Sequence, residues 1–280
     1  MTGKLYVVAV PIGNSDDITL RALRVLADVD LIATEDTRDA RRFLACHNII
    51  NTLTSYHEHN ETQKVPGLIK KLKQGSSVAL VSKAGTPLIS DPGYRLVKAA
   101  VDENIPVVPV PGVSAITAAL SSSGLPTDAF VFEGFLPRTK GKRSRNLKLL
   151  AAEPKTVILY ESPQRICKLL REIRDIMGDR YAVIGREMTK RYEEFLRGSI
   201  SDQIDELERR RTLKGEFTVL IAGLGDQPEI SSDRVQKDIK TALTENRDSL
   251  SNLVKKIAKK HGVSKQTVYK EAIRLKGDAE

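Results

Sequence analysis

"ALVSKAGTPLISDPG", residues 79–93, decides the fold because a short apolar run ends abruptly in a loop rich in glycine and proline. An apolar run of this length, bounded by turn-forming residues, predicts a buried β-strand. The stretches "VPIGN" (residues 10–14) and "VPGVSA" (residues 110–115) follow two further apolar runs in the same way. Glycine lets the backbone approach a ligand closely, and proline limits the conformational entropy that a loop loses on binding.

Ligands of open α/β sheets bind beyond the carboxyl ends of the strands, which is where all three loops would lie. Any one of them could be an ordinary tight turn between a strand and a helix, but the three together predict a shared small-molecule site. None has the Gly-x-Gly-x-x-Gly or the Walker A pattern, so the usual dinucleotide and nucleoside-triphosphate cradles are disfavoured.

Apolar, β-branched runs alternate with helical patterns over residues 1–123, which predicts βαβ units and a mostly parallel, Rossmann-like sheet. Residues 124–225 carry denser strand patterns with mixed connections, so we expect a second α/β domain with a sheet of mixed direction. The Ser-, Gly- and Pro-containing stretch 121–128 is the expected linker. Near the N-terminus, one of residues 15–17 is expected to cap the helix that follows.

A third piece, residues 232–280, shows helical patterns and no strand signal, so the α/β fold carries a C-terminal helical appendage. A turn at residues 262–264, with Ser264 as N-cap, would give the spacing of a helix-turn-helix. The apolar positions that support this interpretation are Leu253, Ile257, Val263, Val268 and Ile273.

The chain of 280 residues is 40% hydrophobic and 29% charged, and its apolar runs are far shorter than the roughly 20 residues that span a bilayer. Its N-terminal "KLYVVAV" is typical of a core strand rather than of a signal peptide. The two cysteines, Cys46 and Cys167, form neither a metal-binding spacing nor a disulfide framework. We therefore expect a cytoplasmic protein with no membrane segment and no metal.

The net charge of +9 is concentrated in two places. Residues 138–148 carry six basic side chains and no acidic one, and residues 253–276 carry eight basic side chains against one glutamate. The rest of the chain is mildly acidic. Patches of this kind suit a polyanion, because each neutralised phosphate releases condensed counterions. Solvated lysines that only keep the protein soluble are the alternative, but two such runs favour nucleic acid.

Seven motifs together resemble the tetrapyrrole-methylase superfamily: "VPIGNSDDIT", "TEDTR", "AGTPLISDPG", "VPGVSA", "ESPQR", "REMTKRYEE" and "GEFTVLIAG". Their order and spacing fit over about residues 4–223. The basic helical appendage is similar to that of one bacterial branch of this superfamily, whose members methylate a ribose 2′-oxygen of small-subunit ribosomal RNA. The small-molecule porphyrin methylases lack it.

The resemblance implies two α/β domains with S-adenosylmethionine in the cleft between them, and a homodimer. It also implies a cytidine ribose in the decoding centre of small-subunit (16S) RNA as the substrate, either in naked RNA or in the assembled subunit. By motif matching, the residues that should touch the cofactor are Ile12, Gly13, Gly85, Thr86, Ile89, Ser114, Ala115 and Tyr160.

Lys83 departs from the pattern, since relatives usually carry aspartate before Ala-Gly-Thr-Pro. The change reverses a charge beside a sulfonium cofactor and an anionic RNA. The sequence leaves two interpretations open: a variant that gains a phosphate contact, or a less active form.

Methyl transfer to a ribose hydroxyl needs a group that accepts the hydroxyl proton, and a carboxylate, histidine or lysine can do so. We expect Glu187 and Lys190 in "REMTK" to act together, because a carboxylate beside a cation stays ionised and the cation stabilises a developing alkoxide. A purely structural ion pair between Arg186 and Glu187 is the alternative. The other candidates near predicted strand ends are Glu35, Asp36, Glu161, His57 and His59.

The first basic run is expected to bind RNA phosphates. The predicted RNA-binding residues are Arg138, Lys140, Lys142, Arg143, Arg145 and Arg165, with Arg191 as a possible addition.

Three other functions remain open at this point. A porphyrinoid methylase would share the fold and cofactor but would not need the basic runs. A DNA-binding regulator is suggested by "HGVSKQTVYK" alone, which leaves the enzyme-like loops unexplained. A non-catalytic ribosome assembly factor that kept the fold gains some weight from Lys83.

Overall fold

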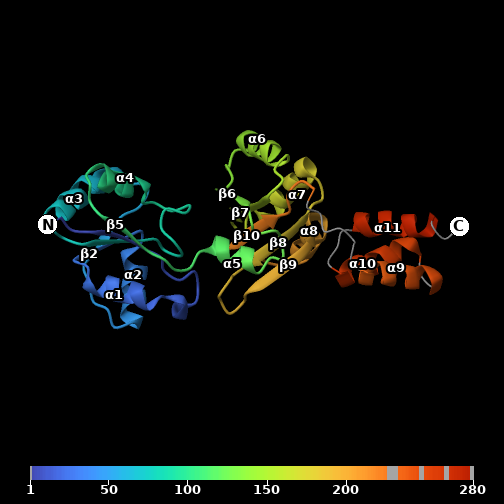
Figure 1. Cartoon of the computed structure of the whole chain (residues 1–280), viewed down its shortest axis with the longest axis horizontal. Helices are drawn as coiled ribbons and strands as arrows, with labels where there is room; N and C mark the ends of the chain where they lie inside the picture. Colours follow the sequence, from blue (N-terminus) through green and yellow to red (C-terminus); the bar gives the residue numbers. More distant parts are fainter. Residues whose placement is uncertain (1, 226–232, 246–248, 262–264, 278–280) are drawn as a thin grey trace. The chain divides into compact units, whose positions relative to one another are not determined.

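The structure is a computed structural model, and it describes residues 2–225, 233–245, 249–261 and 265–277 (Figure 1). By its contacts the chain divides into two compact units, which we describe separately. Unit 1 is Met1–Ala118 together with Met188–Arg191, and unit 2 is Ala119–Glu187 together with Tyr192–Glu280. Unit 1 is therefore made of two stretches that lie far apart in the sequence.

Unit 1 is built on a five-stranded sheet with the strand order β3-β2-β4-β1-β5, in which every neighbouring pair is parallel. The central strand β4 is buried along its whole length, as expected for a sheet that helices cover on both faces. The strands are β1 (Leu5–Val8), β2 (Leu31–Thr34), β3 (Leu53–Ser55), β4 (Val78–Val81) and β5 (Val107–Val110).

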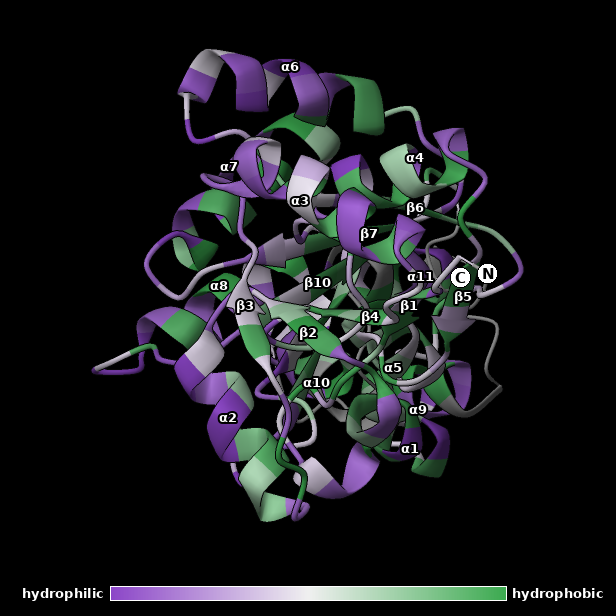
Figure 2. Cartoon of the chain, turned by 90° about the vertical axis from the view of Figure 1, so that its left-hand side faces the viewer, coloured by the Kyte–Doolittle hydropathy of each residue, from purple (hydrophilic) through white to green (hydrophobic). Residues whose placement is uncertain are grey.

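The helices of unit 1 form two layers around this sheet. One apolar cluster joins Leu5 and Leu80 to Leu72 of α3 and Leu96 of α4, and another joins the opposite sheet face to α1 and α2. In Figure 2 these helices carry purple, hydrophilic stretches and the strands between them are largely green. The helices are α1 (Leu20–Asp28), α2 (Thr37–Cys46), α3 (Glu61–Lys73), α4 (Tyr94–Asp102) and the start of α5 (Ala115–Ser121).

The start of α1 differs from the sequence prediction. Residues 15–17 form a separate 3₁₀ turn, which the side chain of Asn14 caps by accepting from the Asp16 amide at 3.1 Å. Helix α1 begins later, where Thr19 Oγ1 accepts from the Ala22 amide at 3.1 Å. The predicted cap was wrong because the chain contains several good capping residues in succession, and each of two short helices uses its own.

Unit 2 contains a second five-stranded sheet, with the order β6-β7-β10-β8-β9. Strands β6 and β7 pair in parallel and the other pairs are antiparallel, so the predicted mixed sheet is confirmed. The strands are β6 (Phe130–Phe135), β7 (Thr156–Glu161), β8 (Tyr181–Arg186), β9 (Glu194–Ser199) and β10 (Phe217–Ile221).

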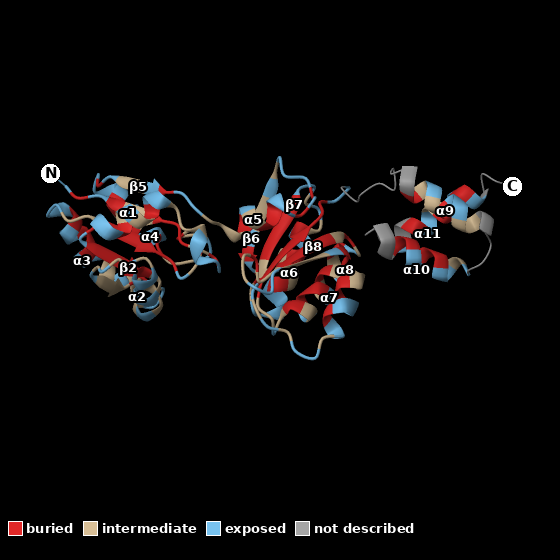
Figure 3. Ribbon diagram, turned by 90° about the horizontal axis from the view of Figure 1, so that it is seen from below, coloured by how far each residue is buried: buried red, intermediate tan, exposed pale blue. Residues whose placement is uncertain are grey.

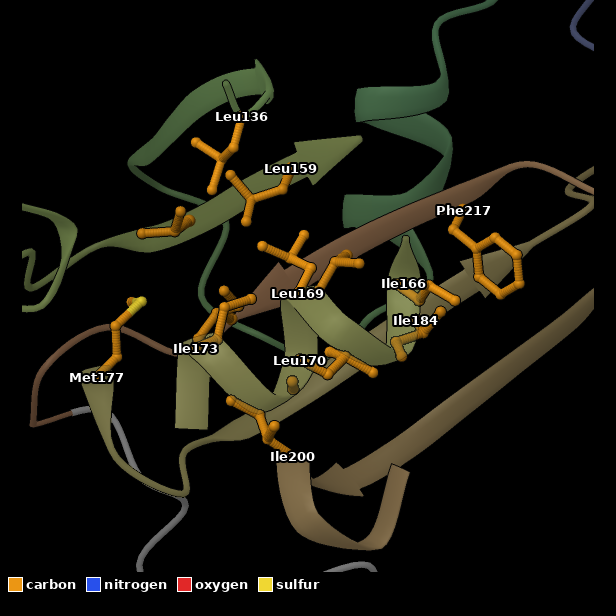
Figure 4. Close-up of a cluster of buried hydrophobic side chains, with 14 of the residues drawn as sticks. Leu136, Leu159, Ile166, Leu169, Leu170, Ile173, Met177, Ile184, Ile200 and Phe217 are labelled. Atoms are coloured by element: carbon orange, nitrogen blue, oxygen red, sulfur yellow. The ribbon is translucent and has the colours of Figure 1, made fainter. Parts of the chain in front are cut away.

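Three helices, α6 (Lys140–Leu150), α7 (Ile166–Met177) and α8 (Ile200–Glu208), pack on one face of this sheet. Figure 4 shows the core between them, where side chains of α7 such as Leu169 and Ile173 meet Leu159 and Ile184 of the strands. Figure 3 shows the same division, with red, buried strands and helices that are pale blue on the side away from the sheet.

The C-terminal residues form α9 (Asp233–Glu245), α10 (Leu250–His261) and α11 (Lys265–Gly277). These helices share an apolar cluster that includes the predicted positions Leu253, Ile257 and Val268. Ile273 is 47% exposed and does not belong to that cluster. The predicted turn at residues 262–264, with Val263 and Ser264, lies outside the described residues. Within the described ranges, no helix has the length and apolar character that a membrane span requires.

Candidate functional site

The three glycine- and proline-rich loops of unit 1 meet. Val10 and Gly85 exchange two backbone hydrogen bonds, of 2.9 and 3.0 Å. Thr86 Oγ1 donates to the carbonyl oxygen of Val113 at 3.0 Å, which joins the second loop to the third. The loops converge because β4, β1 and β5 are adjacent and parallel, so their carboxyl ends share one edge of the sheet. The predicted convergence is confirmed.

Gly85 stands at the centre of this arrangement. Its φ of +75° lies in the left-handed region, where a residue with a Cβ is strained. A Cβ there would lie 3.4 Å from Ile12 Cγ2 and 3.8 Å from the carbonyl oxygen of Val113. Further along the same loop Leu88 and Ser90 also have positive φ, at +73° and +65°. Strain of this kind persists where the surroundings over-determine the backbone, typically at ligand sites.

A fourth segment, Met188–Arg191, belongs to the same unit. Thr189 Oγ1 accepts a hydrogen bond from the Asn14 amide at 3.1 Å. A Cβ on Gly13 would lie 2.4 Å from Lys190 Cγ and 3.0 Å from Thr189 Oγ1, so only glycine permits this approach. The predicted catalytic Lys190 therefore packs against the predicted cofactor loop, a contact that sequence reasoning missed.

Glu187, the other predicted catalytic residue, belongs to unit 2, so its pairing with Lys190 stays a prediction. Its φ is +50°, and its amide donates to the carbonyl oxygen of Glu216 at 3.1 Å. Its Oε1 accepts from the Glu216 amide, also at 3.1 Å. A Cβ on Gly215 would lie 2.5 Å from Glu187 Cγ. The carboxylate is thus held in place by the backbone of residues 215–216.

Two carboxyl groups lie in the segments that follow β2 and β4. Burial raises the pKa of Glu35, against the opposing effects of the backbone amide and the charge of Lys83. Burial, followed by repulsion from Glu35, raises the pKa of Asp91 to about 7, although a hydrogen bond with Ser82 opposes this rise. Sequence reasoning did not single out Asp91 as a candidate, because its environment depends on a residue far away in the chain.

Lys83 projects into solvent, with 66% of its side chain exposed, and its Nζ lies 3.5 Å from Asp39 Oδ2. Asp36, the neighbour of Glu35, accepts from the Arg38 and Asp39 amides at 2.8 and 3.2 Å and so caps α2. The amide of Asp39, followed by that of Arg38, lowers the pKa of Asp36.

The remaining candidates also have structural partners. His57 Nε2 lies 3.0 Å from Asn60 Nδ2, and the ring centroids of His57 and His59 are 6.0 Å apart. The Glu161 side chain is fully buried, and its Oε2 lies 3.1 Å from Arg165 Nη2. Among the described residues, no group of three His, Cys, Asp or Glu side chains is placed to hold a metal ion.

The raised pKa of Asp91 leads to a testable pH dependence. Between its ordinary value of 3.8 and about 7, the folded protein holds a proton that the unfolded chain releases, so this group lowers stability as the pH rises. Asp91→Asn removes that dependence. From pH 5 to pH 8 the free energy of unfolding of the variant should rise by about 1–2 kcal/mol relative to the parent, a range reduced for solvent screening of a partly exposed group.

Urea unfolding of both proteins at the two pH values checks this prediction. Asp205→Asn, an exposed acid on α8, is the control and should shift stability equally at pH 5 and pH 8. If Asp91→Asn also shifts it equally, Asp91 ionises like a solvated side chain and the prediction is wrong.

The basic run 138–148 forms most of α6 in unit 2, but Arg143 does not face solvent. Only 4% of Arg143 is exposed, and its Nε and Nη2 donate to Glu172 Oε2 and Oε1 at 2.6 and 2.7 Å. This hydrogen-bonded pair raises the pKa of Arg143 and lowers the pKa of Glu172. Arg143 lies on the same face of α6 as the buried Leu147 and Leu150, so we correct its assignment from phosphate binding to a structural role.

Arg165 is also largely engaged inside unit 2, since its Nη2 donates to the carbonyl oxygen of Leu136 at 2.9 Å and pairs with Glu161. The charges of Lys168 on α7 and Lys140 on α6 both help to lower the pKa of Glu172, so Lys168 extends the basic surface. Sequence reasoning missed Lys168 because it lies outside the basic run. We use the name "basic surface" for the exposed cations Arg138, Lys140, Lys142, Arg145, Lys148 and Lys168.

Tyr160 also lies in unit 2, whereas the other predicted cofactor residues lie in unit 1. Its ring makes edge contacts with Phe132, at a centroid distance of 5.0 Å, and with Phe135, at 5.6 Å.

Comparison with known proteins identifies the family. The profile described as Tetrapyrrole (Corrin/Porphyrin) Methylases matches residues 4–203. The chain is 45% identical over 276 residues to a protein of Mesorhizobium japonicum, covering 97% of this chain and 92% of that protein. It is 44% identical to a protein of Escherichia coli O157:H7, covering 98% and 96%. A protein of Thermotoga maritima is 48% identical, covering 79% of this chain and 99% of its own length. All three are named "Ribosomal RNA small subunit methyltransferase I".

Solved structures show the same fold at low identity. Uroporphyrin-III C-methyl transferase from Thermus thermophilus, complexed with S-adenyl homocysteine, is 19% identical with a TM-score of 0.57, over 78% of this chain and 97% of that one. Diphthine synthase is 17% identical with a TM-score of 0.60, over 79% and 90%. The parallel sheet, the mixed sheet, the profile match and the curated relatives agree: the chain is a methyltransferase of the tetrapyrrole methylase family, and within it belongs with the proteins named ribosomal RNA small subunit methyltransferase I.

Proposed function

We propose that this protein transfers a methyl group from S-adenosylmethionine to the 2′-oxygen of a cytidine ribose in the decoding centre of 16S ribosomal RNA. The observation that carries the proposal is the identity of 40–48% to relatives whose name specifies small-subunit ribosomal RNA. The choice of the cytidine 2′-oxygen rests on the resemblance of the seven motifs. The homodimer and the cytoplasmic location belong to the proposal on the same ground.

The loops of unit 1 fit the cofactor. Three backbone segments approach one another around Gly85, which has no side chain, and the 39% exposed Ile89 lies in the same loop. A solved relative in fold was crystallised with S-adenyl homocysteine, the demethylated form of this cofactor. When bound, S-adenosylmethionine supplies an electrophilic methyl carbon. The residues that would hold it are Ile12, Gly13, Gly85, Thr86, Ile89, Ser114, Ala115 and Tyr160.

The chain must then orient the ribose hydroxyl and accept its proton. Lys190 packs against Gly13 in the first loop, so its cationic side chain belongs to the same region and can stabilise a developing alkoxide. Glu187 is fixed by Glu216, and a fixed carboxylate can accept a proton without reorganisation. Asp91, with a pKa of about 7, is a further acceptor whose protonation changes near neutral pH.

The basic surface is proposed to bind RNA phosphates. Neutralising Lys140, Lys142, Arg145 and Lys148 to glutamine should weaken RNA binding and lower the slope of log affinity against log salt by about 3–4, if each cation neutralises one phosphate. Titration of small-subunit RNA at several salt concentrations measures both quantities. A quadruple variant at exposed lysines elsewhere, Lys4, Lys70, Lys71 and Lys155, is the matched control. Equal slopes for the two variants would contradict the assignment.

The decisive experiment incubates the protein and labelled S-adenosylmethionine with small subunits that lack the modification, and then maps the labelled sugar. Label on one cytidine 2′-oxygen supports the proposal, and label on a base or on another sugar overturns its specific part. If a porphyrinoid in a parallel incubation is labelled and the RNA is not, the small-molecule methylase is favoured. Cofactor binding without transfer to any of these would favour the assembly factor.

A further inference from the structure

Four aromatic side chains gather on strands β6 and β7 of unit 2. Phe135 is 56% exposed and Phe130 is 40% exposed, while Phe132 and Tyr160 are half-buried. Phe135 is the register partner of Tyr160 across the parallel strand pair, and their ring centroids are 5.6 Å apart at an interplanar angle of 61°. Phe135 therefore presents much of its ring to solvent while its edge contact with Tyr160 limits its freedom.

The backbone after Phe135 is fixed from inside. The carbonyl oxygen of Leu136 accepts from Arg165 Nη2 at 2.9 Å, and those of Pro137 and Arg138 accept from Arg143 Nη1 at 3.0 and 2.8 Å. Both arginines are themselves held, Arg143 by Glu172 and Arg165 by Glu161. The two arginines that the sequence suggested as RNA ligands thus hold the segment that carries Phe135, and Leu136 is anchored in the core with 2% exposure.

The register of β6 also contributes to the exposure of Phe135. The strand is irregular between Phe132 and Gly134, and Gly134 has a φ of +63°. A bulge redirects the side chains that follow it. As a result Leu136 points into the core shown in Figure 4, whereas its neighbour Phe135 stays exposed.

Exposed cations follow this ring in the sequence. Arg138, Lys140 and Lys142 follow within seven residues and are all exposed, and α6 contains no acidic residue. An exposed ring and exposed cations within one unit are the combination that binds single-stranded nucleic acid, because the ring stacks on a base while the cations neutralise phosphates of the same strand. A stable interface with a second copy of the chain needs about 20–30 residues per partner, far more than the four aromatic residues of these two strands.

We propose that Phe135 is a stacking platform for one unpaired base of an RNA substrate whose phosphates Arg138 and the start of α6 hold. This inference rests on the proposed function and adds a base-contacting residue to it. Phe135 carries the proposal rather than Tyr160, because it is the more exposed ring and no cofactor contact is assigned to it.

The test uses the full-length protein with a single-stranded RNA dodecamer that contains one 2-aminopurine, and with small subunits that lack the modification. Phe135→Leu should weaken binding to both by about 5- to 100-fold, the range found when one base–aromatic stack is removed. Phe135→Trp should keep wild-type affinity and quench 2-aminopurine more strongly. Because leucine removes no charge, the salt slope should stay that of the parent.

Tyr94→Leu, at a 68% exposed aromatic residue on α4, is the matched control and should bind RNA like the parent. Calorimetric titration with S-adenosylmethionine is run on every variant, because Phe135 contacts the proposed cofactor residue Tyr160. Equal cofactor affinities for the parent and Phe135→Leu support the stacking assignment, whereas a loss of cofactor affinity as large as the loss of RNA affinity overturns it. If Phe135→Leu binds both RNAs as tightly as Tyr94→Leu does, the proposal is overturned. It is also overturned if Phe135→Leu halves the sedimenting mass while each protomer binds RNA normally, because the ring then belongs to a dimer interface.

Measurements on the wild-type protein distinguish a failure of the stacking assignment from a failure of the proposed function. If it methylates small subunits and Phe135→Leu changes nothing, only the stacking assignment fails. If the wild type neither binds nor methylates small-subunit RNA, the proposed function fails, and the stacking assignment fails with it.

Discussion

Replacing Arg180 with alanine is expected to lower the free energy of unfolding of unit 2 by about 3–5 kcal/mol. The residue is 3% exposed and precedes β8. Its Nε donates to the carbonyl oxygen of Met177 at 3.1 Å, its Nη1 to that of Ala222 at 3.3 Å, and its Nη2 to that of Ala151. One guanidinium therefore joins the ends of α7, β10 and α6. Burial lowers the pKa of Arg180, and its hydrogen bonds to the three carbonyl oxygens offset the cost of that burial.

The expected loss of unfolding free energy is large because alanine leaves three carbonyl oxygens without their donor in the packed interior of unit 2. Each unsatisfied group costs about 1–3 kcal/mol. Native-state hydrogen exchange of amides in β8 and β10 measures the effect, since it reports on this unit alone. Arg180→Lys should recover part of the loss, because an ammonium can satisfy one or two of the carbonyls.

Arg211→Ala provides the comparison at an exposed arginine of the same unit and should change stability by less than about 0.5 kcal/mol. A loss of only that size for Arg180→Ala would mean that water or a rearranged chain replaces the guanidinium. The prediction that Arg180 stabilises unit 2 by joining α7, β10 and α6 would then be wrong.

Replacing Gly13 with valine is expected to reduce methyl transfer to small subunits by about 100-fold or more. Even the first atom of the new side chain would lie 2.4 Å from Lys190 Cγ. The side chains of Lys190 and Thr189 must shift to make room, which disturbs the hydrogen bond between the Asn14 amide and Thr189 Oγ1. The displaced groups are those proposed to bind the cofactor and to stabilise the alkoxide, and misplacement by about 1 Å is enough for a loss of this size.

Single-turnover transfer with labelled cofactor measures the rate, and calorimetry measures cofactor affinity in the same variant. Gly67→Ala in α3 is the control: a Cβ there meets nothing within 4 Å, so activity should be retained and the helix stabilised by about 0.5–1 kcal/mol. Activity of Gly13→Val within threefold of the parent would show that the close approach of Lys190 to the first loop does not matter for catalysis.

The sequence predicts the sheets and the loop cluster well, because these depend on local signals. Apolar runs such as "VALV" become buried strands, and the glycines and prolines that end them mark the carboxyl edge of a parallel sheet. Once β4, β1 and β5 are parallel neighbours, the convergence of their loops follows from geometry. The prediction that Arg143 binds RNA could have been avoided from the sequence. Its spacing of four and seven residues from Leu147 and Leu150 places it on the buried face of α6.

Other features depend on contacts between distant residues and have no local signal. The hydrogen bond from Asn14 to Thr189 spans 175 positions. The raised pKa of Asp91 comes first from burial and then from repulsion by Glu35, which follows a different strand. Phe135 looks in the sequence like any residue of an alternating strand, and only the bulge beside Gly134 and the two internal arginines show why it stays exposed.

The two-stretch composition of unit 1 has a consequence for biosynthesis. During translation, residues 1–118 are synthesised well before Met188–Arg191. The first loop lacks two contacts until then: the packing of Lys190 against Gly13 and the hydrogen bond from the Asn14 amide to Thr189. A nascent chain stalled before Met188 can form its parallel sheet but not the finished first loop. The ribosome must therefore translate the chain beyond β8 before the proposed cofactor-binding loop at Gly13 and Asn14 has all of its contacts.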